Sequence, residues 1–191
     1  MSHMPRYTAG VLAGLAAAFA VTSANADSIF DVSRTTTIST SNVSGSVIIS
    51  NSSIVSVSAA PAIEISAATI ASNTITVNSG STLSSGATTA TMLVADDANI
   101  GTTINVSGTV TNVGTGGAFE VSDTAYTGVV TIRNTGTISG SIDTAAGSDV
   151  LTNTGTITGD IDVGNGTNTI TNTGGTITGA ITGGTGADSI Y

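Results

Sequence analysis

From Ile132 onward the chain repeats a unit of about 19 residues almost letter for letter, the mark of a repeat architecture. The copies are IRNTGTISGSIDTAAGSDV, LTNTGTITGDIDVGNGTNT and ITNTGGTITGAITGGTGADS, and IY begins the next one. Three apolar rows and one asparagine row fall in step: Ile132, Leu151, Ile170 and Ile190; Ile138, Ile157 and Ile177; Ile142, Ile161 and Ile181; Asn134, Asn153 and Asn172. A fixed period of this size predicts a stack of similar coils, each packed on its neighbours.

Within each copy, polar and apolar residues alternate in short runs. Thr156-Ile157-Thr158 and Asp160-Ile161-Asp162 have the pattern of strands with one buried face, and a glycine-rich turn at 164–166 follows them. Such strands cannot close a sheet alone, but strands of successive coils, stacked about 4.8 Å apart, would bury the isoleucine rows. The asparagine row would bond to turn backbone and to the asparagine of the next coil. We therefore predict an all-β fold, a right-handed parallel β-helix with coils of about 19 residues.

The composition favours an ordered β structure. Aromatic residues make up 3% of the chain and charged residues 8%, while Gly, Ser, Thr, Asn and Ala fill the space between regularly spaced Leu, Ile and Val. These small residues favour turns and caps over helices. A disordered chain would be less hydrophobic or more highly charged.

The N-terminal segment, 1–26, has the features of an export signal. Arg6 precedes the apolar stretch at 10–21, which is too short to span a bilayer comfortably. Ala24-Asn25-Ala26 is a small-x-small cleavage site, so we predict cleavage after Ala26. No later segment approaches transmembrane length, and the chain contains no cysteine. We expect an exported protein without disulfide bonds and without a membrane span in its mature part.

The sequence divides into three parts. Residues 1–26 are the predicted signal peptide, and 27–103 are predicted as an irregular, β-rich or β-helix portion with strand-like runs such as VSGSVIIS and NTITVNS. Residues 104–191 are the predicted regular β-helix, although a longer excursion through Phe119 and Tyr126 precedes the strict repeat. We expect the C-terminal end of the stack to be open.

Charge excludes several classes of function. The chain beyond residue 26 keeps all 12 acidic residues but only two basic ones, Arg34 and Arg133, so its net charge is −10. A nucleic-acid partner would need a basic surface. Without histidine or cysteine in this part, Ser-His-Asp and Cys-His sites are impossible and zinc loses its usual ligands. Divalent cations that prefer oxygen ligands remain plausible.

Carboxylate pairs are the remaining candidates for catalysis. A polysaccharide-cleaving β-helix would use clustered carboxylates, and the available pairs are Asp96-Asp97 and Asp160/Asp162. We interpret them as solvated charges of turns and strand faces, because few basic or aromatic residues are present to bind a sugar. We expect no catalytic residues and no enzymatic activity.

The pattern NTGTITGDIDVGNGTNTITNTG, following a signal peptide, resembles the passenger regions of autotransporter adhesins of Gram-negative bacteria. The resemblance covers residues 104–191 in pattern and 27–103 only in character. It implies a right-handed β-helix displayed on, or released from, the cell surface. Autotransporters also carry a C-terminal membrane barrel, which does not follow the repeats here. We expect either the N-terminal part of a longer chain or an open end that another copy covers.

A second resemblance lies in the turns. GGTGADSIY at 183–191 is similar to the calcium-binding nonapeptide of secreted β-roll proteins, which places Asp188 in the ligand position. Asp149 and Asn168 occupy the same position in the two preceding copies, so Asp149, Asn168 and Asp188 are candidate calcium ligands. A tight turn needs the same residue types, so a purely structural role stays open. Asp143 and Asp162 would also stack on adjacent coils, where a cation, water or a raised pKa would relieve their repulsion.

Threonine patterning offers a further alternative. The pairs Thr152/Thr154, Thr154/Thr156 and Thr156/Thr158 form part of an array of the kind that suits ice binding, and the repeat is similar to calcium-dependent ice-binding solenoids of marine bacteria. Threonine is also simply a good exposed strand residue. Our leading hypothesis is an exported cell-surface or extracellular protein with a structural or adhesive role. It would act through its repeat surface and associate with itself head-to-tail or laterally, with surface glycans or host proteins as further partners.

Overall fold

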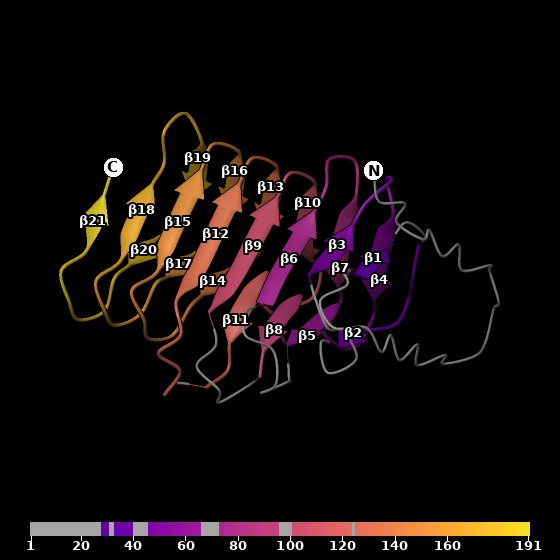
Figure 1. Cartoon of the computed structure of the whole chain (residues 1–191), viewed down its shortest axis with the longest axis horizontal. Helices are drawn as coiled ribbons and strands as arrows, with labels where there is room; N and C mark the ends of the chain where they lie inside the picture. The colour runs from indigo at the N-terminus through magenta and orange to yellow at the C-terminus, as the bar shows by residue number, and fades with distance from the viewer. Residues whose placement is uncertain (1–27, 31–32, 40–45, 66–72, 96–100, 124) are drawn as a thin grey trace, which may run out of the picture.

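The regular structure of the described residues is β-strand throughout. The computed structural model describes residues 28–30, 33–39, 46–65, 73–95, 101–123 and 125–191. Its 21 strands wind into a parallel β-helix (Figure 1). The strands nearest the viewer run upward while the chain advances from the N-terminal end at the right to the C-terminal end at the left, so the winding is right-handed. No helix of these residues is long and apolar enough to cross a membrane.

The strands form three sheets, which run along the solenoid and which we name A, B and C. In order along sheet A they are β1 (Ser28–Phe30), β3 (Val47–Ile49), β6 (Asn73–Val77), β9 (Thr102–Val106), β12 (Val130–Asn134), β15 (Val150–Asn153), β18 (Thr169–Thr171) and β21 (Ser189–Ile190). Sheet B contains β4 (Ile54–Val57), β7 (Thr82–Ser85), β10 (Thr109–Asn112), β13 (Thr137–Ser139), β16 (Thr156–Thr158) and β19 (Thr176–Thr178). Sheet C contains β2 (Ile38–Ser39), β5 (Ile63–Ile65), β8 (Met92–Val94), β11 (Phe119–Val121), β14 (Ile142–Asp143), β17 (Ile161–Asp162) and β20 (Ile181–Thr182).

From β3 to β20, each turn of the solenoid contributes one strand to sheet A, then one to B and one to C, whereas the first described turn has strands only in A and C and the last ends with β21 in A. Every pair of neighbouring strands is parallel, as expected when each coil stacks on the one before it. The predicted fold class is therefore confirmed: an all-β, right-handed parallel β-helix.

Coil length changes along the chain. The predicted spacing holds in the strict repeat, where Ile138 pairs with Ile157 and Ile142 with Ile161. Earlier coils are longer, since Thr102 pairs with Val130. The extra residues lie mainly in the connections: residues 113–118 join β10 to β11, whereas only 140–141 join β13 to β14. Strand pairing tolerates this variation because the extra residues lie between the strands, where some of them, such as Ala118 and Tyr126, pack into the core. The same β-helix thus also includes the described part of 27–103, whose coils the sequence indicated only by irregular strand-like runs.

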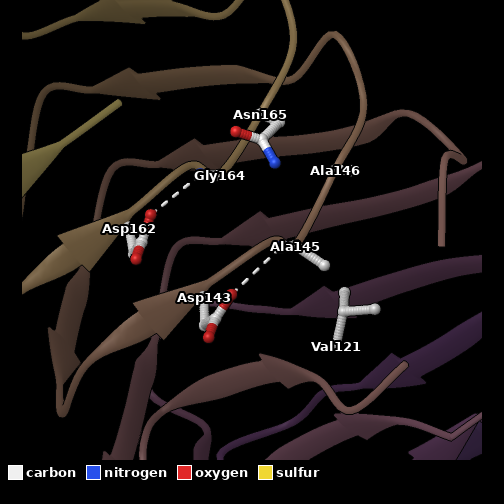
Figure 2. A pocket seen from close by; sticks show the side chains of 7 residues that line it. All are labelled: Val121, Asp143, Ala145, Ala146, Asp162, Gly164 and Asn165. Carbon is white, nitrogen blue, oxygen red and sulfur yellow. Dashed lines mark hydrogen bonds between the residues drawn. The ribbon is translucent and has the colours of Figure 1, made fainter. Parts of the chain in front are cut away.

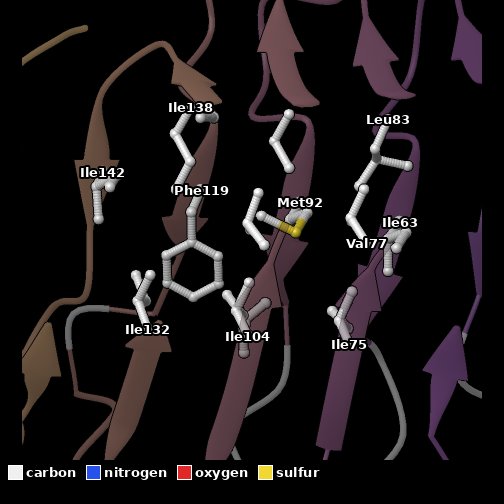
Figure 3. Close-up of a cluster of buried hydrophobic side chains, with 14 of the residues drawn as sticks. Ile63, Ile75, Val77, Leu83, Met92, Ile104, Phe119, Ile132, Ile138 and Ile142 are labelled. Carbon is white, nitrogen blue, oxygen red and sulfur yellow. The ribbon is translucent and has the colours of Figure 1, made fainter. Parts of the chain in front are cut away.

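The core is the column of side chains between the three sheets. Alternation along each strand turns one residue in two inward. In two of the predicted rows Ile138, Ile157, Ile142 and Ile161 are at most 2% exposed, whereas Ile177 and Ile181 near the C-terminal end are only partly buried. In the longer coils the same columns continue, so that Ile75, Ile104 and Ile132 of sheet A stack in register. Figure 3 shows this row beside Met92 and Phe119 of sheet C. Full burial of each such side chain contributes about 1.5–3 kcal/mol.

Candidate functional site

The outer faces of the three sheets differ in charge. Sheet C carries a column of outward residues that is mostly acidic: Glu64, Leu93, Glu120, Asp143, Asp162 and Thr182. The six described strands of sheet B contain no charged residue. Sheet A exposes Arg133 among hydroxyl-bearing side chains. The repeat therefore sorts its surface chemistry by face.

On sheet C, the predicted stacking of Asp143 and Asp162 is present. The two residues pair in register and are exposed, and Figure 2 shows their carboxylates one above the other. Each carboxylate accepts a hydrogen bond at the start of its own turn, Asp143 from the backbone N–H of Ala145 at 3.0 Å and Asp162 from that of Gly164 at 2.9 Å. These bonds and the surrounding water offset the repulsion between the two charges.

A shallow hollow of about 200 Å³ lies beside these two carboxylates and is also lined by Asn165. The amide oxygen of Asn165 accepts hydrogen bonds from the backbone N–H and the hydroxyl of Thr185, at 2.9 and 2.7 Å, on the next coil. Within the described ranges, no three acidic, histidine or cysteine side chains lie together as a metal site would require. Calcium at this hollow stays a prediction.

The three candidate calcium ligands of the turns form one row at the corner that leads from sheet C to sheet A. Asp149 and Asn168 are only 2% and 1% exposed, whereas Asp188 is exposed. Side-chain oxygens of the row accept from backbone N–H groups one coil earlier: Asp149 from Val130 at 2.7 Å, Asn168 from Asp149 at 2.9 Å, and Asp188 from Asn168 at 3.0 Å. In this arrangement the row caps buried backbone N–H groups. The sequence indicated a structural role for these residues only in forming a tight turn.

Asp149 is the buried acid of this row. Its second carboxylate oxygen accepts the hydroxyl of Thr144 at 2.6 Å. Desolvation by burial raises the pKa of Asp149, and the hydrogen bonds from Thr144 and Val130 lower it by less. One coil later, Asn168 replaces the acid and buried Val163 stands in the place of Thr144. A neutral amide therefore fills the same position where the hydroxyl donor is missing.

We expect Asp149→Asn to change how stability depends on pH. A raised pKa in the folded state means that the folded chain binds this proton more tightly than the unfolded chain. The carboxylate therefore costs stability at pH values above its folded pKa, and this cost disappears as the pH falls through that pKa. Urea unfolding of both proteins between pH 8 and pH 4 should show the wild type gaining stability relative to Asp149→Asn on acidification. A difference that stays constant with pH would contradict this prediction.

The predicted asparagine ladder is confirmed at the corner between sheets A and B. The amide of Asn134 donates to Asn153 at 2.8 Å, and that of Asn153 donates to Asn172 at 2.8 Å. Both donors also reach turn carbonyls, such as Gly136 at 3.4 Å and Gly155 at 3.3 Å. Asn134 and Asn153 are at most 1% exposed, so the ladder satisfies amides that would otherwise be costly to bury.

Sheet B presents two columns of hydroxyl groups on successive coils. The first contains Thr82, Thr109, Thr137, Thr156 and Thr176, and the second contains Ser84, Thr111, Ser139, Thr158 and Thr178. Of the predicted threonine pairs, only Thr156 and Thr158 lie on one strand, because Thr154 lies in the turn between sheets A and B. The strict repeat contains the C-terminal part of these columns, but their members on the longer coils appear only when coils of different length are aligned.

The remaining predicted residues are dispersed. Asp160 accepts a hydrogen bond from the backbone N–H of Ala180 at 2.8 Å on the next coil, and so does not share a partner with Asp162. The guanidinium of Arg34 lies over the ring of Phe30, 4.9 Å from its centroid, and burial lowers the pKa of Arg34. Asp96, Asp97 and the cleavage site at Ala26 lie outside the described residues.

The comparisons with known proteins give no relative. The chain matches no protein-family model, and neither a curated protein nor a solved structure is significantly similar to it. Function must therefore be argued from the faces of the solenoid.

Proposed function

We propose that this chain is an exported structural or adhesive solenoid of the bacterial cell surface or extracellular space, and that it associates laterally with copies of itself. Export rests on the signal features of residues 1–26 and on the resemblance of the repeats to autotransporter passengers. The mechanism rests on a repeated outer surface rather than on a single pocket. Surface glycans or proteins are candidates for further partners of the same surface.

The observation that carries the proposal is the contrast between sheets B and C. Copies with a net charge of −10 repel one another, and Glu64, Glu120, Asp143 and Asp162 concentrate four of the charges on sheet C. The described strands of sheet B offer an uncharged and periodic face on the same molecule. Contact through sheet B brings hydroxyl rows together and keeps the acidic columns apart.

Calcium binding is the second candidate, and the stacked carboxylates of Asp143 and Asp162 favour it. A hard divalent cation between them would remove their repulsion and use oxygen ligands. Calcium-dependent ice binding is one form of this second candidate. The threonine columns of sheet B favour it, because strand stacking spaces their hydroxyl-bearing side chains about 4.8 Å apart along the axis. Both alternatives are compatible with an extracellular location.

Light scattering coupled to size-exclusion chromatography tests the proposal, with and without calcium or chelator. We expect the mass of the wild type to rise with concentration, whereas Thr156→Glu, on sheet B, should require at least tenfold more protein to associate. Thr131→Glu adds the same charge to sheet A, at a similarly half-exposed strand position, and should behave as the wild type does.

The outcomes separate the candidates. Association that chelator abolishes would support calcium, and thermal hysteresis of the same samples would support ice binding. A strict monomer under all conditions would contradict the proposal, and equal effects of the two glutamates would contradict the assignment to sheet B.

A further inference from the structure

The corner row of Asp149, Asn168 and Asp188 has a direction. Each side chain reaches back and accepts the backbone N–H of the residue that precedes it in the row, one coil earlier. No described side chain of the row caps the N–H of a later coil. The strand ladder beside it runs the other way, because Thr169 N–H donates to the carbonyl of Asp149 and Ser189 N–H to that of Asn168. Side-chain and main-chain hydrogen bonds across this corner therefore run in opposite directions along the stack.

Each buried member of the row also holds its own turn. Asp149 accepts the hydroxyl of Thr144, and the amide of Asn168 donates to the carbonyl of Gly164 at 3.2 Å. The side chain thus ties the turn of its own coil to the corner of the preceding coil. A glycine two residues earlier leaves room for this, since a Cβ on Gly147 would lie 2.9 Å from a carboxylate oxygen of Asp149.

The row begins where the coils shorten. Val130 occupies the equivalent position in the preceding coil, and its own side chain offers no acceptor oxygen. The N–H of Thr102, which pairs with Val130 from one coil earlier still, donates to the carbonyl of Val129 instead. The side-chain cap is therefore a property of the short coils of the strict repeat. In this longer coil the backbone carbonyl of Val129 takes the place of the side-chain cap.

We propose that this row is a one-way latch: each short coil is closed at this corner by the Asp or Asn of the coil that follows it. A buried N–H without an acceptor is costly, so the corner of a coil is complete only when its successor is in place. As the chain folds from its N-terminal side, closure of the corner lags one coil behind the growing stack. Loss of one acceptor uncaps the N–H of the preceding coil, while the main-chain bond from its own coil to the preceding one, such as that from Ser189 N–H to the carbonyl of Asn168, stays in place.

Amide hydrogen exchange of the full chain tests the direction of the latch. Asp188 is exposed, so Asp188→Ala is expected to fold. In this variant the amide of Asn168 should exchange about tenfold faster, while that of Ser189, on the coil of the substitution, should change little. Asp188→Asn keeps the acceptor oxygen and should preserve the slow exchange at Asn168.

Asp160→Ala is the matched control, because Asp160 is also exposed but caps Ala180 on the following coil. It should accelerate exchange at Ala180 and leave Asn168 unchanged. An unchanged rate at Asn168 in Asp188→Ala would overturn the proposal, and so would a rise at Ser189 as large as that at Asn168.

Discussion

Replacing Asn153 by alanine is expected to lower the free energy of unfolding by about 2–4 kcal/mol, because several buried polar groups lose their partner at once. Asn153 is fully buried; it accepts from Asn134 and donates to Asn172, Gly155 and Thr176. Alanine can make none of these side-chain hydrogen bonds, and water cannot reach the buried site to replace them. Urea unfolding followed by circular dichroism measures the loss.

Asn172→Ala provides the control for this prediction. Asn172 is only half-buried and accepts the amide of Asn153, which keeps two carbonyl partners when Asn172 is removed. Its loss should cost about 1 kcal/mol or less. Similar losses for the two variants would show that burial in the ladder does not set the stability of the corner.

Tyr126→Ala is the second substitution with a large expected effect. Tyr126 is 1% exposed, and it lies in the 122–129 connection where the coils shorten. Removal of its ring leaves a cavity in the core, and comparable truncations of aromatic residues cost about 3–5 kcal/mol. The midpoint of urea unfolding should fall accordingly.

Tyr126→Phe removes only the hydroxyl, and so separates its contribution to stability from that of the ring. The hydroxyl lies 3.5 Å from that of Thr102, at the limit of a hydrogen bond, so this variant should lose no more than about 1.5 kcal/mol. If Tyr126→Phe were as destabilising as Tyr126→Ala, polar contacts and not packing would hold this connection.

The fold was predictable from the repeat because two independent patterns agree. Alternation fixes which residues of a strand are buried, and equal spacing aligns Ile138 with Ile157 and Asn134 with Asn153 on neighbouring coils. For the long coils only an irregular β-rich or β-helix portion was predicted, without a register, because their connections vary in length while the pairing of Ile75 with Ile104 does not depend on them. Sequence spacing alone cannot reveal such a register.

The functional surfaces were predictable only in part. In the sequence Asp149 fits a calcium-turn motif and a backbone cap equally well, since both need an acceptor oxygen after a glycine turn. Its burial and its bond from Val130 N–H show the cap, and calcium binding stays a prediction. The hydroxyl columns of sheet B were missed because the turn at Thr154 separates Thr152 from Thr156. Thr152 and Thr156 are close in sequence but lie on sheets A and B, respectively.

The separation of chemistry by face has a consequence for how such a protein changes over time. Duplication of one repeat unit lengthens the rod by about 4.8 Å and extends all three faces together. One further hydroxyl pair joins sheet B and one further outward residue joins sheet C, while the exposed ends stay as they were. Binding strength along a face then grows with the number of units, as in any multivalent contact. If a face binds as we propose, repeat number alone can tune the reach of the molecule and the avidity of that face, without any new type of contact.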